Sequence, residues 1–358
     1  MTLTDKKEMA KEMAGYLNDA YSKIPPSLQT ASKPQLKWPS GISWSKANDV
    51  ITLRFNEDAI KKNMQTDDNA FESWILAMVA LGKYDPFFHC NYSVTFYKLD
   101  KSHADAGDEE RVEWQHYQRF LFRLNQFFEL FGTQWFLLND EDRKLAASSE
   151  YFKYELKCNT GGGLRDIPPD MSKIDMDKLS ESQLEWFLSK HSKSDRFKNS
   201  IPKTFTTGEV YRQFPIGIFK QKVSKECSLF PSGKACIDLV AVGGDDTSFW
   251  IFELKKKGNK ALGIVSELLF YVAIVGDIIT GNIAVDRPKD TDCYNPQLLR
   301  DKTAINACFL APDFHPLFLN SIIDILNDAF RLSGKRIPVI FHKAVLDTDS
   351  GRISEVSK

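Results

Sequence analysis

Two copies of the tripeptide Glu-Leu-Lys place an acid and a base close together in this chain. One is Glu253-Leu254-Lys255, directly after the apolar residues 249–252, and the other spans residues 155–157. Side chains two positions apart share one face of a β-strand, so the acid and the base of each copy would point the same way. On a buried strand such charges are costly unless they are paired or bind a cation.

The two copies differ in their surroundings. The copy at 155–157 follows the polar segment "NDEDRKLAASSE", and no apolar strand with an aspartate precedes it. This pattern predicts that Glu155 and Lys157 form a solvated pair on a helix or at an edge surface. The copy at 253–255 is the candidate for chemistry. Its alternative is a salt bridge on a solvent-facing edge, which would favour polar neighbours over the apolar residues 249–252.

A third charged residue, Asp238, stands alone in the apolar run "CIDLVAV". Gly-Gly-Asp-Asp at 243–246 is typical of a turn that folds residues 234–255 into a hairpin. Alternation can then bring Asp238 and Glu253 together, and a pair of carboxylates favours Mg²⁺ or Mn²⁺. Lys255, one pleat away, could orient or deprotonate a water or offset charge on a phosphate. These are the parts needed for metal-assisted phosphodiester hydrolysis.

Asp238 followed by Glu253-Leu254-Lys255, on a hairpin with a helix and a strand before it and a long helix after it, resembles the PD-(D/E)xK nuclease superfamily. The resemblance covers about residues 180–312. It implies a restriction-endonuclease-like αβββαβ core. It also implies that Asp238 and Glu253 bind the metal, that Leu254 adds its backbone carbonyl, and that Lys255 is catalytic.

Two helices extend this resemblance. Many members of the superfamily carry a further metal-binding glutamate on the first helix, and "SESQLEWFL" offers Glu181, with Glu185 as the alternative. The RecB-like branch has Gln-x-x-x-Tyr on the helix after the lysine. Here Glu267 stands in place of that glutamine, four residues before Tyr271, and both are candidate nucleic-acid contacts. Ile237 stands where the motif has its proline.

Basic and polar residues near these motifs are further candidate contacts to nucleic acid. Lys257 and Lys260 could meet phosphate beyond the metal, or they could form a solubilising charge run. Arg212 and Gln213 lie on the strand that precedes the hairpin. The formal net charge of −1 argues against a generally basic coat, although a local basic groove remains compatible with it.

The hydrophobic pattern predicts the elements that position these residues. In the second half it predicts the order α-β-β-β-α-β, then α-β, with helices at 180–191, 260–279 and 316–332, and strands at 208–221, 234–255 (two strands), 304–312 and 337–346. In the first half it predicts helices at 5–22, 70–81 and 109–131, and strands at 48–55 and 91–99. The aromatic stripe on 109–131 indicates a core-facing helix, with a base-stacking surface as the alternative.

These elements predict an α/β protein that is α+β overall. Residues 1–157 would form an α+β recognition or regulatory domain, 158–178 a linker rich in Gly, Pro and Asp, and 179–358 a nuclease domain with a mixed central sheet. Six cysteines without a Cys-x-x-Cys pair indicate neither a zinc site nor a disulfide framework, and therefore a reducing compartment. The apolar run 261–281 contains two acids and predicts a buried helix, so we expect a cytoplasmic protein with no membrane partner.

The expected function is that of a hydrolase. We expect a Mg²⁺- or Mn²⁺-dependent endonuclease that binds and cleaves nucleic acid, DNA above all, in a restriction-type or antiviral defence role. One alternative is a nucleic-acid-binding module of nuclease ancestry that does not cleave. Another is a partner-controlled toxin or defence component that acts on RNA. The first domain would recognise the target, a protein partner or a second copy of the chain.

Overall fold

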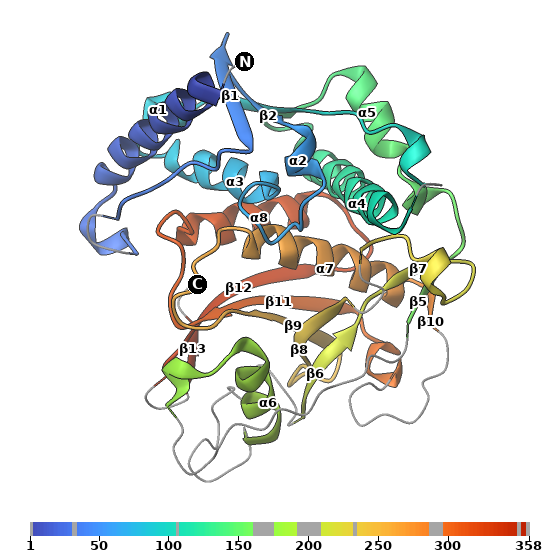
Figure 1. Cartoon of the computed structure of the whole chain (residues 1–358). Helices are drawn as coiled ribbons and strands as arrows, with labels where there is room; N and C mark the ends of the chain where they lie inside the picture. The colour runs from blue at the N-terminus through green and yellow to red at the C-terminus, as the bar shows by residue number, and fades with distance from the viewer. Residues whose placement is uncertain are drawn as a thin grey trace. The chain divides into compact units, whose positions relative to one another are not determined.

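The computed structural model describes residues 3–30, 34–104, 107–159, 175–191, 209–231, 235–285, 296–348 and 352–355. The fold is mixed α/β and α+β overall, as the sequence predicted (Figure 1). It divides into two compact units. Unit 1 comprises Met1–Lys153, Ala261–Ser266 and His315–Ala329, and unit 2 comprises Tyr154–Lys260, Glu267–Phe314 and Phe330–Lys358. Within the described ranges, no helix has the length and apolarity needed to cross a bilayer.

Unit 1 contains a four-stranded sheet in the order β1-β2-β3-β4. Its elements are α1 (Leu3–Ser22), β1 (Ile42–Ala47), β2 (Val50–Phe55), α2 (Glu57–Ile60), α3 (Phe71–Leu81), β3 (Asn91–Phe96), α4 (Asp108–Phe131), β4 (Phe136–Leu137) and α5 (Asp140–Ala147). Strands β1 and β2 are antiparallel, whereas β2, β3 and β4 run parallel. The turn between β1 and β2 has Asn48 and Asp49 at φ of 48° and 58°, the left-handed values of a two-residue hairpin. The strand predicted at 48–55 therefore starts after this turn, and β1 was not predicted.

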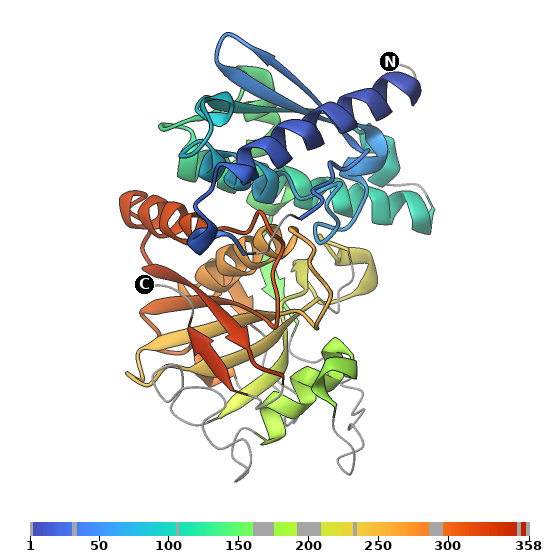
Figure 2. The same cartoon turned by 90° about the vertical axis from the view of Figure 1, so that its left-hand side faces the viewer.

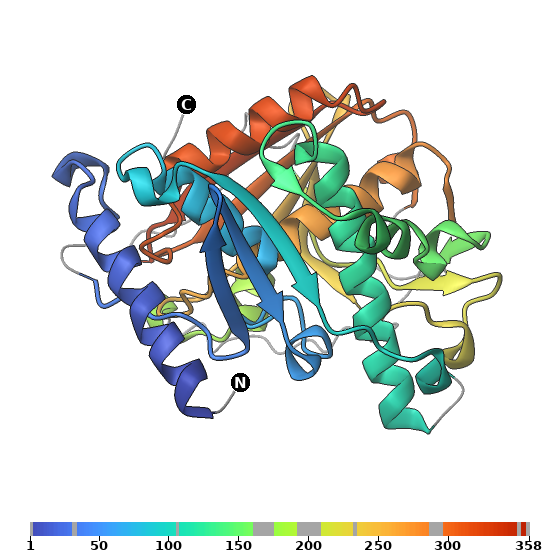
Figure 3. The same ribbon diagram turned by 90° about the horizontal axis from the view of Figure 1, so that it is seen from above.

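Aromatic side chains fill the core of unit 1. Phe120 of α4 contacts Phe55, Phe71 and Phe96, with ring centroids 5.2 to 5.7 Å apart. The aromatic stripe on α4 is thus a core face, and the alternative of a base-stacking surface was wrong. Figure 3 shows α1 and α4 flanking the strands of this sheet. A buried ion pair between Arg123 of α4 and Glu72 of α3 joins the two helices.

Unit 2 is built on a six-stranded sheet in the order β13-β12-β11-β9-β8-β6. Its strands are β6 (Val210–Pro215), β8 (Cys236–Val242), β9 (Ser248–Leu254), β11 (Ala304–Ala311), β12 (Val339–Leu346) and β13 (Ile353–Glu355). Strands β6, β8 and β9 are antiparallel neighbours, and β9, β11 and β12 are parallel neighbours, so the sheet is mixed as predicted. A smaller sheet has the order β10-β5-β7 and consists of β5 (Leu156–Cys158), β7 (Ile218–Lys220) and β10 (Ile283–Val285).

The remaining helices are α6 (Glu181–His191), α7 (Ile264–Ile279) and α8 (Asn320–Leu332). Helix α6 begins after Ser180, whose Oγ accepts a hydrogen bond from the backbone N–H of Gln183 at 3.3 Å, as expected of an N-cap. Its buried Leu184 and Phe187 belong to one core cluster with residues of β8 and β9 such as Phe252. Figures 1 and 2 show α6 and the unit 2 part of α7 on opposite faces of the six-stranded sheet.

The order α6, β6, β8, β9, α7, β11, α8, β12 follows the order predicted from the sequence, but β7 and β10 are additional strands. The single strand predicted at 208–221 is divided into β6 and β7, which belong to different sheets. The domain boundaries differ from the predicted ones. The chain changes unit after Lys153 and not after 157, because Leu156–Cys158 pairs as β5 inside unit 2. The segments Ala261–Ser266 and His315–Ala329 belong to unit 1, although 179–358 was expected to form one domain.

The structure describes both ends of the predicted linker 158–178. Asn159 exchanges hydrogen bonds with the backbone of Gly217, at 3.1 Å through its N–H and at 2.8 Å through its Oδ1. Met176–Lys178 forms a turn of 3₁₀ helix. The linker prediction is therefore wrong for these ends, because their backbone groups are paired. Residues 160–174 of that prediction lie outside the described residues.

Candidate metal centre

The candidate site lies where strands β8 and β9 part. Their antiparallel pairing runs from Val242 opposite Phe249 to Leu239 opposite Phe252. One residue further along, the Asp238 carboxylate replaces the backbone as partner, because its Oδ2 accepts the N–H of Leu254 at 2.8 Å. The hairpin therefore places Asp238 beside the peptide that follows Glu253, as side-chain alternation predicted.

Lys255, directly after the end of β9, connects this strand to helix α7. Its Nζ donates a hydrogen bond to Oε1 of Glu253 and another, at 3.2 Å, to Oε2 of Glu267. The hydroxyl of Tyr271 donates to Oε1 of Glu267 at 2.7 Å. Glu253, Lys255, Glu267 and Tyr271 are all buried, whereas Asp238 is half-buried. We call Asp238, Glu253, Lys255 and Glu267 the Lys255 cluster.

Burial and mutual repulsion raise the pKa values of two carboxylates of the Lys255 cluster, those of Asp238 and Glu253. Burial raises the pKa of Asp238 well above its ordinary value, and Glu267 raises it further, while Lys255 opposes the shift. Burial also raises the pKa of Glu253, to which the charges of Asp238 and Glu267 add. Three acids close to one base thus store unfavourable charge that a bound cation would relieve.

The pKa of Lys255 is also raised, but for a different reason. Burial by itself would lower the pKa of Lys255, since an ammonium loses its hydration. The charges of Glu253, Glu267 and Asp238 outweigh this effect, so the pKa is raised above the ordinary lysine value. The side chain is therefore a cation at neutral pH, which favours charge neutralisation over proton abstraction among the roles considered from the sequence.

Helix α6 adds a carboxylate to this region. Glu185 is buried, and the side-chain amide of Gln213 donates to its Oε2. Burial raises the pKa of Glu185 to about 7, against the opposing effects of Gln213 and Arg212. Glu185 also raises the pKa of Asp238, so the two carboxylates lie within electrostatic reach. Glu181, the first choice from the sequence, is half-buried and accepts a hydrogen bond from Asn259 at 2.7 Å. Of these two glutamates, Glu185 acts on the charge of Asp238, whereas Glu181 acts on Lys255 and on Glu185 itself.

The residues fit a divalent cation in charge and in donor type. Oε2 of Glu253 is buried and has no hydrogen-bond partner among the described residues, which is costly for a carboxylate oxygen unless a cation binds it. Asp238 is the half-buried neighbour that could share such an ion, with the Leu254 carbonyl and Glu185 as further oxygen donors. A preformed set of three or more His, Cys, Asp or Glu ligands does not occur in the described part of the chain. Asp238 and Glu253 are the two residues that could hold such an ion.

The predicted nucleic-acid contacts fall into three groups: two accessible lysines, the half-buried Gln213, and three buried residues. Lys257 and Lys260 are about half exposed, at 51% and 46% of their side chains, and are ion-paired with Asp177 and Asp313. They remain accessible to phosphate, in competition with these acids. Gln213 is half-buried at a φ of 55° and directs its amide to Glu185.

Three of the predicted contacts need correction. Arg212, Glu267 and Tyr271 are buried, so they do not form a nucleic-acid-binding surface. Helix α7 turns Glu267 and Tyr271 towards the strand that carries Lys255. Sequence reasoning missed the Glu267–Lys255 ion pair. Its signal was an acid within the apolar run 261–281, which needs a buried partner.

The other Glu-Leu-Lys copy lies in a different setting. Leu156–Cys158 is the middle strand of the three-stranded sheet, so neither a helix nor an edge strand carries this copy, and that part of the prediction was wrong. Glu155 is exposed, as expected of a solvated residue, and Lys157 is half-buried.

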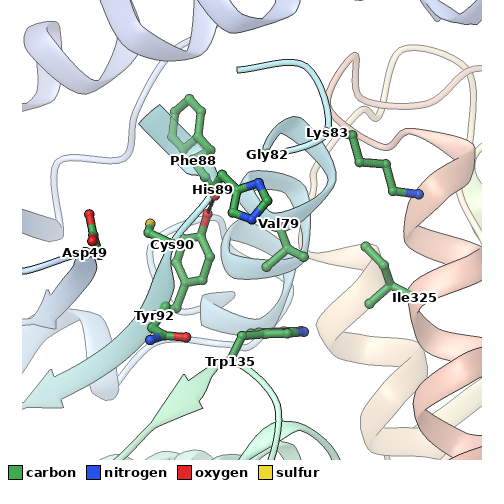
Figure 4. Close-up of a pocket in the computed structure, with 11 residues that line it drawn as sticks. Asp49, Val79, Gly82, Lys83, Phe88, His89, Cys90, Tyr92, Trp135 and Ile325 are labelled. Atoms are coloured by element: carbon green, nitrogen blue, oxygen red, sulfur yellow. Dashed lines mark hydrogen bonds between the residues drawn. The ribbon is translucent and has the colours of Figure 1, made fainter. Parts of the chain in front are cut away.

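Unit 1 contains a pocket that the sequence did not predict. Its volume is about 530 Å³, and its lining includes Asp49, Lys83, His89, Tyr92 and Trp135. Figure 4 shows Asp49 and Cys90 on one side, Lys83 and Ile325 on the other, and His89 between them. No member of the Lys255 cluster lines this pocket. A pocket of this size suits a small molecule. It is separate from the candidate metal centre, whose buried charged residues do not line it.

Comparison of the chain with family models, with curated proteins and with solved structures gave no match. The interpretation of the site therefore depends on the geometry of its own residues.

Proposed function

We propose that this protein is a divalent-metal-dependent nuclease of the PD-(D/E)xK type, with Asp238, Glu253 and Lys255 as its reactive residues. The observation that carries the proposal is the buried, charge-imbalanced Lys255 cluster at the point where two strands of a rigid sheet separate. Structural ion pairs do not need surplus carboxylates, whereas a cation-binding site does. We further propose that the substrate is DNA, cut internally in a restriction-type or defence role in the cytoplasm.

Each residue would have a distinct task. Mg²⁺ or Mn²⁺, when bound, would polarise a phosphoryl oxygen and make a bound water more acidic. Asp238 and Glu253 would hold the ion, and the Leu254 N–H fixes the Asp238 carboxylate through the bond to its Oδ2. Lys255, kept as a cation by its acidic neighbours, would offset the charge that develops on the phosphate. The strands β8 and β9 fix these groups at constant spacing, which is what oriented catalysis requires.

The experiment is a cleavage assay on the purified full chain. Supercoiled plasmid, linear duplex, single-stranded DNA and RNA are each incubated with Mg²⁺, Mn²⁺ or EDTA. The matched control is Asp238→Asn, whose side-chain oxygen can still accept the Leu254 N–H but loses its charge. We expect cleavage of at least one DNA substrate with metal, none with EDTA, and none with Asp238→Asn. Nicked or linearised plasmid would show internal cutting.

The same assay decides among the alternatives. Binding of nucleic acid without cleavage by the wild type would identify a non-cleaving module of nuclease ancestry. Cleavage of RNA but not of DNA would support a toxin or defence component that acts on RNA. Equal cleavage by the wild type and Asp238→Asn would contradict the assignment of the site.

A further inference from the structure

Tyr271 and Glu267 form a buried chain of hydrogen bonds that ends on the Lys255 ammonium. We call these two residues the relay. They are four residues apart on α7, so they share one face of the helix. The Tyr271 hydroxyl donates to one oxygen of Glu267, at 2.7 Å, and the other oxygen accepts from Lys255 Nζ at 3.2 Å. Both oxygens of Glu267 are therefore held in fixed directions by side chains.

Lys255 has two carboxylate partners, Glu253 and Glu267, which differ in their proposed roles. Glu253 is on the same strand and is one of the two residues proposed to hold the divalent cation. An ammonium and a divalent cation both draw on the Glu253 carboxylate, so they compete for its negative charge. A buried ammonium that lost its only partner would be left uncompensated, which is strongly unfavourable away from water. Glu267 removes this difficulty because it is a second carboxylate already in contact with the same nitrogen.

We propose that Glu267, oriented by Tyr271, is a positioning residue. It keeps the Lys255 ammonium in place when Glu253 binds the divalent cation. The inference rests on the proposed function and assigns its site two residues that do not touch the substrate. This positioning role requires a carboxylate at position 267, because an amide could accept a hydrogen bond from Lys255 but could not balance the charge of its ammonium.

A different role for the relay is purely structural, as a buried ion pair that fastens α7 to β9. The two roles differ in one measurable quantity. A structural pair changes the stability of the protein when it is broken and leaves the cation affinity of the folded protein unchanged. A positioning pair also changes the cation affinity, because Lys255 without Glu267 stays on Glu253 and competes with the metal.

The experiment compares three variants with the wild type. Glu267→Gln removes the charge, Tyr271→Phe removes only the orienting hydroxyl, and Glu72→Gln neutralises the buried carboxylate that pairs with Arg123 in unit 1. Mg²⁺ and Ca²⁺ affinities are measured by calorimetry on the full chain, and thermal unfolding is recorded without metal. Single-turnover cleavage of the DNA that the wild type cuts is followed in Mg²⁺, and binding of that DNA in Ca²⁺.

We expect Glu267→Gln to weaken Mg²⁺ binding and to slow the single-turnover rate, each by about 10- to 100-fold, which is the usual cost of losing a group that orients a metal site. Tyr271→Phe should act in the same direction with a smaller effect. DNA binding in Ca²⁺ at saturating metal should stay within about twofold of wild type, because neither side chain reaches the surface. Glu72→Gln should lower the unfolding temperature and leave the Mg²⁺ affinity unchanged.

Each outcome has one interpretation. If Glu267→Gln and Tyr271→Phe lower stability but bind Mg²⁺ and cleave like the wild type, the relay is structural and the inference is overturned. If Glu267→Gln does not fold, Tyr271→Phe decides alone, since it removes one hydroxyl. If the wild type neither binds Mg²⁺ nor cleaves any substrate, the proposed function fails and the inference fails with it.

Discussion

Two buried ionic clusters, one in each unit, show how differently a fold can treat charge. In unit 1, Arg123 donates from Nε to Glu72 at 2.7 Å and from Nη1 and Nη2 to the side chain and backbone of Asn69 at 2.5 and 3.0 Å. The Ser266 hydroxyl donates at 2.8 Å to Oε2 of Glu72, which also accepts a hydrogen bond from Nη2 of Arg123. In this Glu72 network, one acid faces one base and both carboxylate oxygens have donors.

The Lys255 cluster in unit 2 lacks this balance. Three carboxylates face one ammonium, with Glu185 nearby, and Oε2 of Glu253 is buried without a hydrogen-bond partner among the described residues. Asp238 keeps part of its surface open. In a network that only supports the fold, the chain's own side chains pair every hydrogen-bonding group and every charge. A site that binds a cation instead has unpaired acceptors and surplus negative charge before the cation binds. This difference in balance matches the two proposed roles, a structural pair in unit 1 and a cation site in unit 2, although both clusters are buried ion pairs.

The largest effect should come from breaking the satisfied network. Arg123→Leu leaves the Glu72 carboxylate buried without its base, and removal of one partner of a buried pair typically costs about 3–5 kcal/mol. We expect a marked fall in the unfolding free energy, measured by urea denaturation. Mg²⁺ affinity of the protein that remains folded should not change. Loss of Mg²⁺ affinity with little loss of stability would reverse the roles assigned to the two clusters.

The same kind of change in the Lys255 cluster should affect chemistry and not stability. Glu253→Gln removes a metal ligand and a surplus negative charge. We expect the cleavage rate to fall by at least about a hundredfold, as for loss of metal-borne stabilisation, while the unfolding free energy without metal changes little. Asp238→Asn should behave alike. Single-turnover cleavage and denaturation of the same preparations provide the test, and a cleavage rate equal to wild type in both variants would contradict the site.

The sequence predicted the parts of this comparison that depend on local pattern. Alternating side chains and the Gly-Gly-Asp-Asp turn placed Asp238 and Glu253 on facing strands, since a strand has a period of two. The apolar run preceding Glu253 identified the buried copy of Glu-Leu-Lys. The 3.6-residue period identified α4 and its core face, which includes Phe120.

Long-range packing decided what the sequence could not predict. The strands β5 and β10 have three residues each, which is too short to show an alternating pattern. They are defined by pairing between distant segments, β5 with β10 and with β7. Glu181 and Glu185 are one helical turn apart on the same face, so only the position of α6 against β8 chooses between them. The burial of Arg212 and Tyr271 likewise depends on which elements cover them.

A smaller effect should appear in the pH dependence of stability. The pKa of Glu185 is about 7 in the folded protein, against 4.5 ordinarily, so the folded state holds a proton that the unfolded state releases. Stability without metal should therefore fall as pH rises from about 4.5 to 7, by up to about 1.4 kcal/mol per pH unit for one proton. Glu185→Gln should reduce this slope. Glu181→Gln, one turn earlier on α6, should retain most of it. Urea denaturation at pH 5 and pH 7 measures the difference, and an unchanged slope in Glu185→Gln would contradict the burial of an ionisable Glu185.

The smallest effect concerns the second copy of Glu-Leu-Lys. This copy sharpens the comparison because its three residues are identical to those of the copy at 253–255. Glu155 is exposed and Lys157 is half-buried on β5, in a sheet that does not contain β8 or β9. The double variant Glu155→Ala with Lys157→Ala should therefore cleave and bind Mg²⁺ within about twofold of wild type, because a motif acts only in its structural context. The matched double variant Glu253→Ala with Lys255→Ala should lose both activities. Cleavage and calorimetry on the two proteins form the test. If the variant at 155 and 157 is inactive and the variant at 253 and 255 is active, the reactive copy is the one on β5, and the surplus charge around Lys255 has another cause.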